Sequence, residues 1–376
     1  MTGASDAERR RLHDTFAALC RIVSPSGHER ACADAVAAEL RGLGLIVAED
    51  EAGTALGGDC GNLLTRIPGS RERTMLFCAH LDTVPISAPP EPIVRDGAWQ
   101  NANEEILGAD NKVAVAALLG LARRLVAEPA AVGVELLFTV GEERSLAGAK
   151  EFETGVLRST VGFAFDSASP LGGVVVASPT QYGITAELRG VAAHAGVRPE
   201  TGRSAILAAA RAIANMRLGR IDGQTTANVG VISGGSAANI VPERCRLVAE
   251  ARGIDGARAE QIASELVECL TDAANDPECE CDLDVTIERQ FDGYRVRASS
   301  DEVGLAFGAL RDCGFEPLPT TSGGGSDVNA LRARGLAVVN LANGTEHNHE
   351  PGERVPTAAL EAILDIAIGL VARGGR

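Results

Sequence analysis

The sequence Thr74-Met-Leu-Phe-Cys-Ala-His-Leu-Asp-Thr-Val84 begins as an apolar run and ends with two polar side chains, His80 and Asp82. An apolar run of this length indicates a buried strand. Residues two apart on a strand point to the same face, so Asp82 can orient the imidazole of His80. A carboxylate fixes metal-binding histidines in this way. The stretch therefore predicts a strand that ends in a candidate metal ligand, although a histidine in this place can also be structural.

The segments around this strand alternate between strand and helix patterns. Helical spacing is expected near residues 12–23, 29–40, 111–126 and 146–152, and strand-like apolar runs near 62–67, 134–140 and 161–165. Strands that alternate with helices favour an α/β domain with a mixed, mostly parallel sheet covered by helices.

The pattern changes beyond Pro179. A β-α-β-β-α-β order is expected there, with strands near 184–188, 227–232 and 244–251 and helices near 201–216 and 257–273. This order is typical of a small antiparallel sheet with two helices on one face. We therefore expect an inserted α+β, ferredoxin-like domain at residues 181–294, and a first domain made of residues 1–180 and 295–376.

Composition narrows the class of protein. A chain of 376 residues exceeds the usual size of a single core, which agrees with two domains. The net charge of -16 argues against nucleic acid as a partner, because a phosphate backbone needs a basic surface. No apolar segment approaches the length that spans a membrane. Nine irregularly spaced cysteines and the absence of a signal-peptide pattern favour a reducing, cytoplasmic compartment.

Further acidic and imidazole side chains follow other predicted strands and loops. Asp110 precedes a helix and could be its N-cap; the pair Glu142 and Glu143 follows an apolar strand, although adjacent carboxylates often form a solvated turn. Asp166 ends the next apolar run, and His349 lies in a late loop. Ligand sites of α/β proteins form at the carboxyl ends of strands.

These side chains meet the needs of a dinuclear metal centre. Such a centre requires one bridging carboxylate, a histidine and a carboxylate for each ion, and a free carboxylate that takes a proton from water. The sequence offers five candidate ligands and one candidate base.

At this point the motifs resemble a known family, the dizinc peptidases that include tripeptide aminopeptidase (peptidase T), glutamate carboxypeptidases and aminoacylases. The resemblance covers nearly the whole chain and leans toward the peptidase T branch through Ala177–Gln181 and Leu218–Asp222. It is carried in order by His80–Val84, Gly108–Lys112, Gly141–Glu143, Asp166, Ala193–Gly196, Asn239–Glu243, Gly324–Asp327 and His349–Val355.

The resemblance implies a role for each residue of the centre. His80 and Asp166 are expected to hold one Zn²⁺, Glu143 and His349 the other, and Asp110 to bridge them; Co²⁺ or Mn²⁺ could replace zinc. Glu142 is expected to be the general base, and Asp82, which orients His80, is the second catalytic residue. The bond between Asp110 and Asn111 is expected to be cis. The spacing of His347 to the residues that follow differs from the family motif. His347 is therefore expected to face solvent or to contact a metal-binding side chain without binding the metal itself.

Four residues of the region around the insert are expected to contact a short peptide substrate: His194, Asn239, Arg252 and Gly324. Each also has a structural interpretation, as a strand-end histidine, a loop asparagine, a surface arginine and a flexible glycine. The resemblance further implies a homodimer through residues 181–294, with His194 completing the partner's active site. Three alternative functions remain open. The protein is a tripeptide aminopeptidase, a carboxypeptidase or N-acyl amino acid deacylase of the same family, or a non-catalytic scaffold with this fold.

Overall fold

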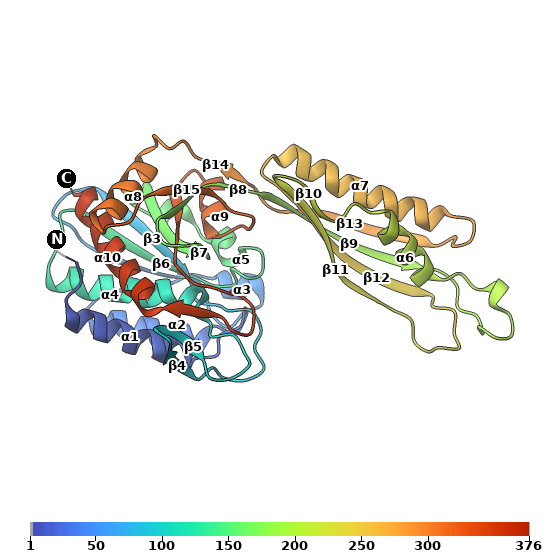
Figure 1. Cartoon of the computed structure of the whole chain (residues 1–376), viewed down its shortest axis with the longest axis horizontal. Helices are drawn as coiled ribbons and strands as arrows, with labels where there is room; N and C mark the ends of the chain where they lie inside the picture. The colour runs from blue at the N-terminus through green and yellow to red at the C-terminus, as the bar shows by residue number, and fades with distance from the viewer. Residues whose placement is uncertain (1–2, 376) are drawn as a thin grey trace. The chain divides into compact units, whose positions relative to one another are not determined.

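The computed structural model describes residues 3–375. The chain divides into two compact units (Figure 1). The first unit holds the residues up to Ala177, Arg295–Ser322 and the residues from Ser326 onward; the second holds Ser178–Tyr294 and Gly323–Gly325. Gly323–Gly325 therefore groups with the second unit, although it is far from Ser178–Tyr294 in the sequence.

A nine-stranded mixed sheet forms the centre of the first unit. Its path is β1-β2-β6-β3-β7-β16-β8-β14, and β15 pairs with β8. Pairing is parallel between β6, β3, β7 and β16, and antiparallel at β1, β2 and between β16 and β8. The strands are β1 (Val47–Glu49), β2 (Leu63–Ile67), β3 (Thr74–His80), β6 (Gly133–Thr139), β7 (Val161–Ser167), β8 (Gly173–Ser178), β14 (Tyr294–Arg295), β15 (Leu318–Thr321) and β16 (Ala337–Ala342).

Helices cover this sheet, and a small three-stranded sheet, β17-β5-β4, accompanies it. Helix α4 packs on β3 and β7 and contacts α1 and α10, whereas α9 packs on β16 and contacts α5. The helices are α1 (Asp6–Cys20), α2 (Arg30–Gly42), α3 (Ala52–Leu56), α4 (Ala109–Ala127), α5 (Ala147–Glu151), α8 (Asp301–Asp312), α9 (Asp327–Ala333) and α10 (Thr357–Gly374); the small strands are β4 (Pro92–Arg95), β5 (Ala98–Asn101) and β17 (Arg354–Pro356).

The central strands are buried along their whole length, as the apolar runs predict. Every residue of β6 is buried, and β3 is buried from Met75 to His80. Burial on both faces follows from helices on both sides of a parallel sheet. The expected mixed, mostly parallel sheet is thus confirmed.

The second unit is a five-stranded antiparallel sheet, β10-β11-β12-β9-β13, with α6 and α7 side by side on one face (Figure 1). Four of its strands have the ferredoxin-like order that the sequence predicts, and β10 adds an unpredicted edge strand. The elements are β9 (Thr180–Arg189), α6 (Ala205–Asn215), β10 (Gly219–Asp222), β11 (Thr225–Gly234), β12 (Arg244–Gly253), α7 (Gly256–Asn275) and β13 (Asp282–Phe291).

Two boundaries in the second unit differ from expectation. Helix α6 begins at Ala205 rather than near 201, because the Ser204 side chain caps it by accepting a hydrogen bond from the Leu207 amide at 3.2 Å. Strand β12 runs on to Gly253, so Arg252 lies within the strand and not after it. Alternation along β12 places Leu247, Ala249 and Ala251 in the core with the helices.

None of the helices within residues 3–375 combines the length and the apolar character that a membrane span requires.

Candidate metal centre

His80 is the last residue of β3 and is almost completely buried, with 1% of its surface exposed. Its Nδ1 lies 3.0 Å from the backbone carbonyl oxygen of Asp82 and 3.4 Å from Asp82 Oδ1. A carbonyl oxygen can only accept, so Nδ1 carries the hydrogen and the lone pair is on Nε2. The second ring nitrogen is therefore oriented as a metal ligand requires.

Asp110 lies between two imidazoles. Its Oδ1 is 3.4 Å from His80 Nε2, and its Oδ2 is 3.3 Å from His349 Nε2. The peptide bond between Asp110 and Asn111 is cis, which confirms the bond expected from the family resemblance. Each oxygen of Asp110 thus faces a different histidine, which is the geometry of a bridging carboxylate.

The other predicted ligands complete two adjoining clusters. Asp166 Oδ1 lies 3.5 Å from His80 Nε2, and Glu143 Oε1 lies 2.8 Å from His349 Nε2. In each cluster the ligand atoms lie within 4.8 Å of one another: His80, Asp110 and Asp166 form one, and Asp110, Glu143 and His349 the other. Asp110 belongs to both. Glu142, His80 and Glu143 form a third such group, so the predicted base lies beside both clusters.

The carboxylate of Asp82 acts mainly on the turn that carries the glutamates. It accepts hydrogen bonds from the Glu142 amide and the Glu143 amide, both at 3.0 Å, and from Ser26 Oγ at 2.6 Å. The same carboxylate also lies against His80, as the sequence predicts, because Asp82 Oδ1 is 3.4 Å from His80 Nδ1. Because β3 ends at His80, Asp82 lies in the loop, and its backbone carbonyl oxygen comes even nearer to the imidazole than its carboxylate does.

The cluster concentrates negative charge that the protein itself does not balance. In the part of the chain described, no Lys or Arg forms an ion pair with Asp110, Glu143 or Asp166; their partners are the two histidines. Asp110 Oδ1 is buried without a hydrogen-bond partner. Buried carboxylates are costly unless they are paired or bind metal ions. The donor set of imidazole nitrogens and carboxylate oxygens fits divalent cations such as Zn²⁺.

The pKa values reflect this crowding. Hydrogen bonds that His349 donates to the carboxylates of Asp110 and Glu143 raise the pKa of His349 to about 10. Burial and the neighbouring carboxylate of Asp166 raise the pKa of Glu142 well above its usual range. The carboxylates draw protons onto the site, and divalent cations would supply the same positive charge.

Three residues outside the predicted set support the centre. Glu353 accepts hydrogen bonds from the amides of Gly108 at 2.7 Å and Asp110 at 2.9 Å, and Asn348 donates to Asp110 Oδ2 at 2.8 Å. Asp327 is buried and accepts a hydrogen bond from Thr139 Oγ1; burial raises the pKa of Asp327 to about 6. Asp327 and Glu353 lie inside the motifs that carry the resemblance and Asn348 directly precedes one of them, but no spacing rule indicates their contacts. His347 is exposed to solvent.

The predicted substrate residues lie in the second unit. His194 and Asn239 are exposed, and their segments are joined by a hydrogen bond from the Ala195 amide to the Asn239 carbonyl at 2.9 Å. His194 Nδ1 accepts from the Gly196 amide at 3.2 Å, so its Nε2 carries the hydrogen and can donate. Gly324 accepts a hydrogen bond from Ser178 Oγ at 3.0 Å.

Arg252 has a partner within its own strand. Its Nε and one terminal nitrogen each donate to the carboxylate of Glu250 at 3.0 Å. The side chain of Arg252 is 28% exposed, so part of it is accessible to a ligand.

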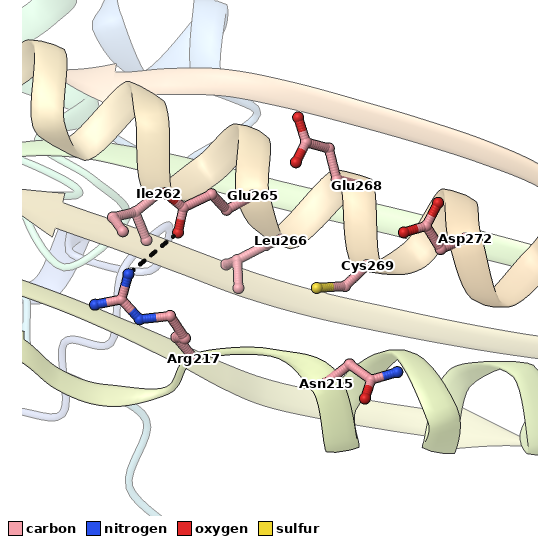
Figure 2. A pocket seen from close by; sticks show the side chains of 8 residues that line it. All are labelled: Asn215, Arg217, Ile262, Glu265, Leu266, Glu268, Cys269 and Asp272. Carbon is pink, nitrogen blue, oxygen red and sulfur yellow. Dashed lines mark ion pairs between the residues drawn. The ribbon is translucent and has the colours of Figure 1, made fainter.

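A separate hollow of about 240 Å³ lies between α6 and α7 (Figure 2). None of the predicted site residues lines it. Its lining is Asn215, Arg217, Ile262, Glu265, Leu266, Glu268, Cys269 and Asp272.

Comparison with known proteins identifies the family. Residues 62–195 match the peptidase family M28 model, and residues 181–277 match a peptidase dimerisation domain. The uncharacterized protein YqjE of Bacillus subtilis is 34% identical over 96% of this chain and 98% of its own length. A tripeptidase of Staphylococcus aureus is 34% identical with a TM-score of 0.89, and the aminopeptidase PepT of Bacillus cereus is 33% identical with a TM-score of 0.84; each pair covers 98% of this chain and 99% of the other.

The chain belongs to the dizinc peptidase family. It is a metallopeptidase, and the family predicted from its motifs is confirmed. Curated relatives below 30% identity also include a probable carboxypeptidase of Paracoccidioides brasiliensis, with 79% of this chain and 74% of that protein covered, and the acetylornithine deacetylase of Myxococcus xanthus, with 80% of each covered.

Proposed function

We propose that this metallopeptidase is an aminopeptidase that removes the N-terminal residue of short peptides, tripeptides above all. The observation that carries the proposal is the pair of adjoining clusters that share Asp110, together with full-length similarity to two solved tripeptide-type peptidases. His80 and Asp166 would hold one divalent cation, Glu143 and His349 the other, and Asp110 both.

The residues around the centre divide the chemistry. Two cations bound there would lower the pKa of a coordinated water and polarise the scissile carbonyl. Glu142 takes the proton of the attacking water and delivers it to the leaving amine. Asp82 holds the Glu142 and Glu143 amides in place, and Glu353 holds the backbone of Asp110.

The second unit supplies substrate contacts in this proposal. The Nε2 hydrogen of His194 can donate to the oxyanion that forms on the carbonyl, and Asn239 and Gly324 contact the peptide. Arg252 binds the C-terminal carboxylate of the peptide, because a guanidinium matches a carboxylate with two hydrogen bonds. Glu250 holds Arg252 beforehand, so the substrate has to share or displace that pair.

The test is a digest of one tripeptide of three different residues, offered free, N-acetylated and C-amidated, with products identified by mass spectrometry. We expect release of the first residue from the free peptide, little cleavage of the acetylated peptide, and an amidation penalty that is smaller in Arg252→Ala. Release of the last residue would favour a carboxypeptidase, and cleavage of the acetyl group alone a deacylase. Those two outcomes would contradict the proposal.

We also propose a homodimer through residues 181–294, in which His194 of one subunit serves the centre of the other. The match of residues 181–277 to a peptidase dimerisation domain supports it. Mixed His194→Ala and Glu142→Ala subunits should then recover part of the activity after exchange, because some dimers contain one complete site. A fully active monomer in sedimentation would rule this arrangement out.

A further inference from the structure

A second group of metal-binding side chains lies in the first unit, near the Gly141–Glu143 turn. Ligand atoms of Glu29, Asp59 and Cys60 lie within 4.8 Å of one another. Glu29 and Cys60 are buried, whereas Asp59 is exposed. None of the three belongs to the dinuclear centre.

Only one of the two carboxylate oxygens of Glu29 has hydrogen-bond partners. Its Oε1 accepts hydrogen bonds from the amides of Gly27 at 2.9 Å and Gly141 at 3.0 Å. Its Oε2 is buried without a partner, and only 1% of the residue is exposed. Among residues 3–375, no Lys, Arg or His forms an ion pair with it. A buried carboxylate oxygen without a donor costs free energy that a bound cation would offset.

Glu29 and Cys60 both line a cavity of about 60 Å³, together with Gly27, Gly141 and Arg144. This volume is enough for one small ion with a water molecule. The close approach of Cys60 depends on Gly53, because a Cβ at that position would come within 2.3 Å of the Cys60 carbonyl oxygen. Gly53 therefore lets the backbone of Cys60 pass close to α3.

The loop that carries Asp59 is held independently of any ion. The Arg30 amide donates to Asp59 Oδ1 at 2.9 Å, and the Arg30 guanidinium donates to the Asp59 carbonyl at 3.0 and 3.1 Å. The charge of Arg30 is balanced by Glu49 and by Asp34 at 3.2 Å. Arg30 therefore positions the loop without repelling a cation through an uncompensated charge.

We propose that Glu29, Asp59 and Cys60 form a third cation site, separate from the dinuclear centre and selective for Zn²⁺. A thiolate with two carboxylates favours zinc over Mg²⁺ or Ca²⁺, which take oxygen ligands only. Water completes the tetrahedron from the cavity. Because Glu29 also holds the Gly141 amide, the ion braces the turn that presents Glu142 and Glu143, and its role is structural.

The thiolate gives this site a signature that the dinuclear centre lacks. When Co²⁺ replaces zinc, only a site with a sulfur ligand shows thiolate-to-metal charge-transfer absorption in the near ultraviolet. We expect this band in the wild type loaded with Co²⁺, its retention in the control Cys313→Ser, and its loss in Cys60→Ser. Zinc content measured by mass spectrometry should fall from three ions per chain to two.

Asp59→Asn is a second test variant that should leave the fold intact. Asp59 is exposed, and the side-chain oxygen of the asparagine can still accept the hydrogen bond from the Arg30 amide. This variant should keep the band but bind the third ion at least about tenfold more weakly. A wild type that holds two ions and shows no band, with water alone beside Glu29, would overturn the proposal. So would a band that survives in Cys60→Ser.

Discussion

Glu142 is the residue whose chemistry differs most from that of its neighbour. Both glutamates follow β6, but Glu143 contacts His349, whereas Glu142 belongs to the group with His80 and Glu143. Glu142→Gln should keep both cations while kcat falls by at least about 10²-fold, because the amide cannot take a proton. The test measures kcat and the number of bound cations on the same sample. Glu151→Gln, an exposed change on α5, is the control; near-normal turnover in a metal-replete Glu142→Gln enzyme would remove the role.

At the residue scale, the sequence identifies the ligand side chains, but it does not predict which residues contact and support them. The five predicted ligands come together because they lie at the carboxyl ends of β3 and β7, after β6, at the start of α4 and in the loop before β17. The support of Asp110 by Glu353 could not be predicted, because 243 residues separate them and no periodicity relates them. The contact of the Asp82 carboxylate with His80 is as predicted, but its hydrogen bonds to the Glu142 and Glu143 amides could not be read from the sequence, because sixty residues separate these groups.

At the scale of elements, α1 and α4 are joined by the ion pair of Glu8 and Arg124. Arg124 donates to both Glu8 oxygens, at 2.6 and 2.5 Å, and is 8% exposed. The hydrogen bond from Arg124 lowers the pKa of Glu8 to about 2. A lowered carboxyl pKa stabilises the fold above the unfolded pKa near 4.5, and this contribution is lost as pH falls toward 2.

Glu8→Gln should therefore lower the free energy of unfolding at pH 7 by about 1 kcal/mol after allowance for solvent screening. The glutamine can still close the capping box with Ser5, so helix α1 keeps its start. Urea unfolding at several pH values should show the difference from wild type shrinking below about pH 4.5. Glu128→Gln, which removes an exposed partner of Arg124, is the control; a difference independent of pH would contradict the linkage.

Strong local patterns explain which elements could be predicted. Strands β3, β6 and β7 are continuous apolar runs, and α6 and α7 have clear helical spacing, so all five are visible in the sequence. Strands β4, β5, β10 and β17 have three or four residues and mixed burial, so pairing alone defines them. The assignment of Gly323–Gly325 to the second unit also depends on packing: a Cβ on Gly325 would lie 2.4 Å from the Phe291 ring.

At the scale of the whole molecule, the first unit contains every candidate metal ligand and the second contains the predicted substrate residues. Similarity over 98% of the chain to solved peptidases agrees with a complete catalytic arrangement. Similarity of fold indicates the type of reaction better than it indicates the substrate, because the loops around the site determine which substrate binds. The central claim is therefore the dinuclear centre bridged by Asp110.

The most direct test is a crystal structure of the zinc-loaded protein with anomalous scattering recorded at the zinc absorption edge. At the dinuclear centre we expect two strong peaks about 3.5 Å apart. One should lie between His80 and Asp166 and the other between Glu143 and His349, with one Asp110 oxygen on each. A single peak at this site, or two ions with Asp110 or His349 outside their coordination, would contradict the account.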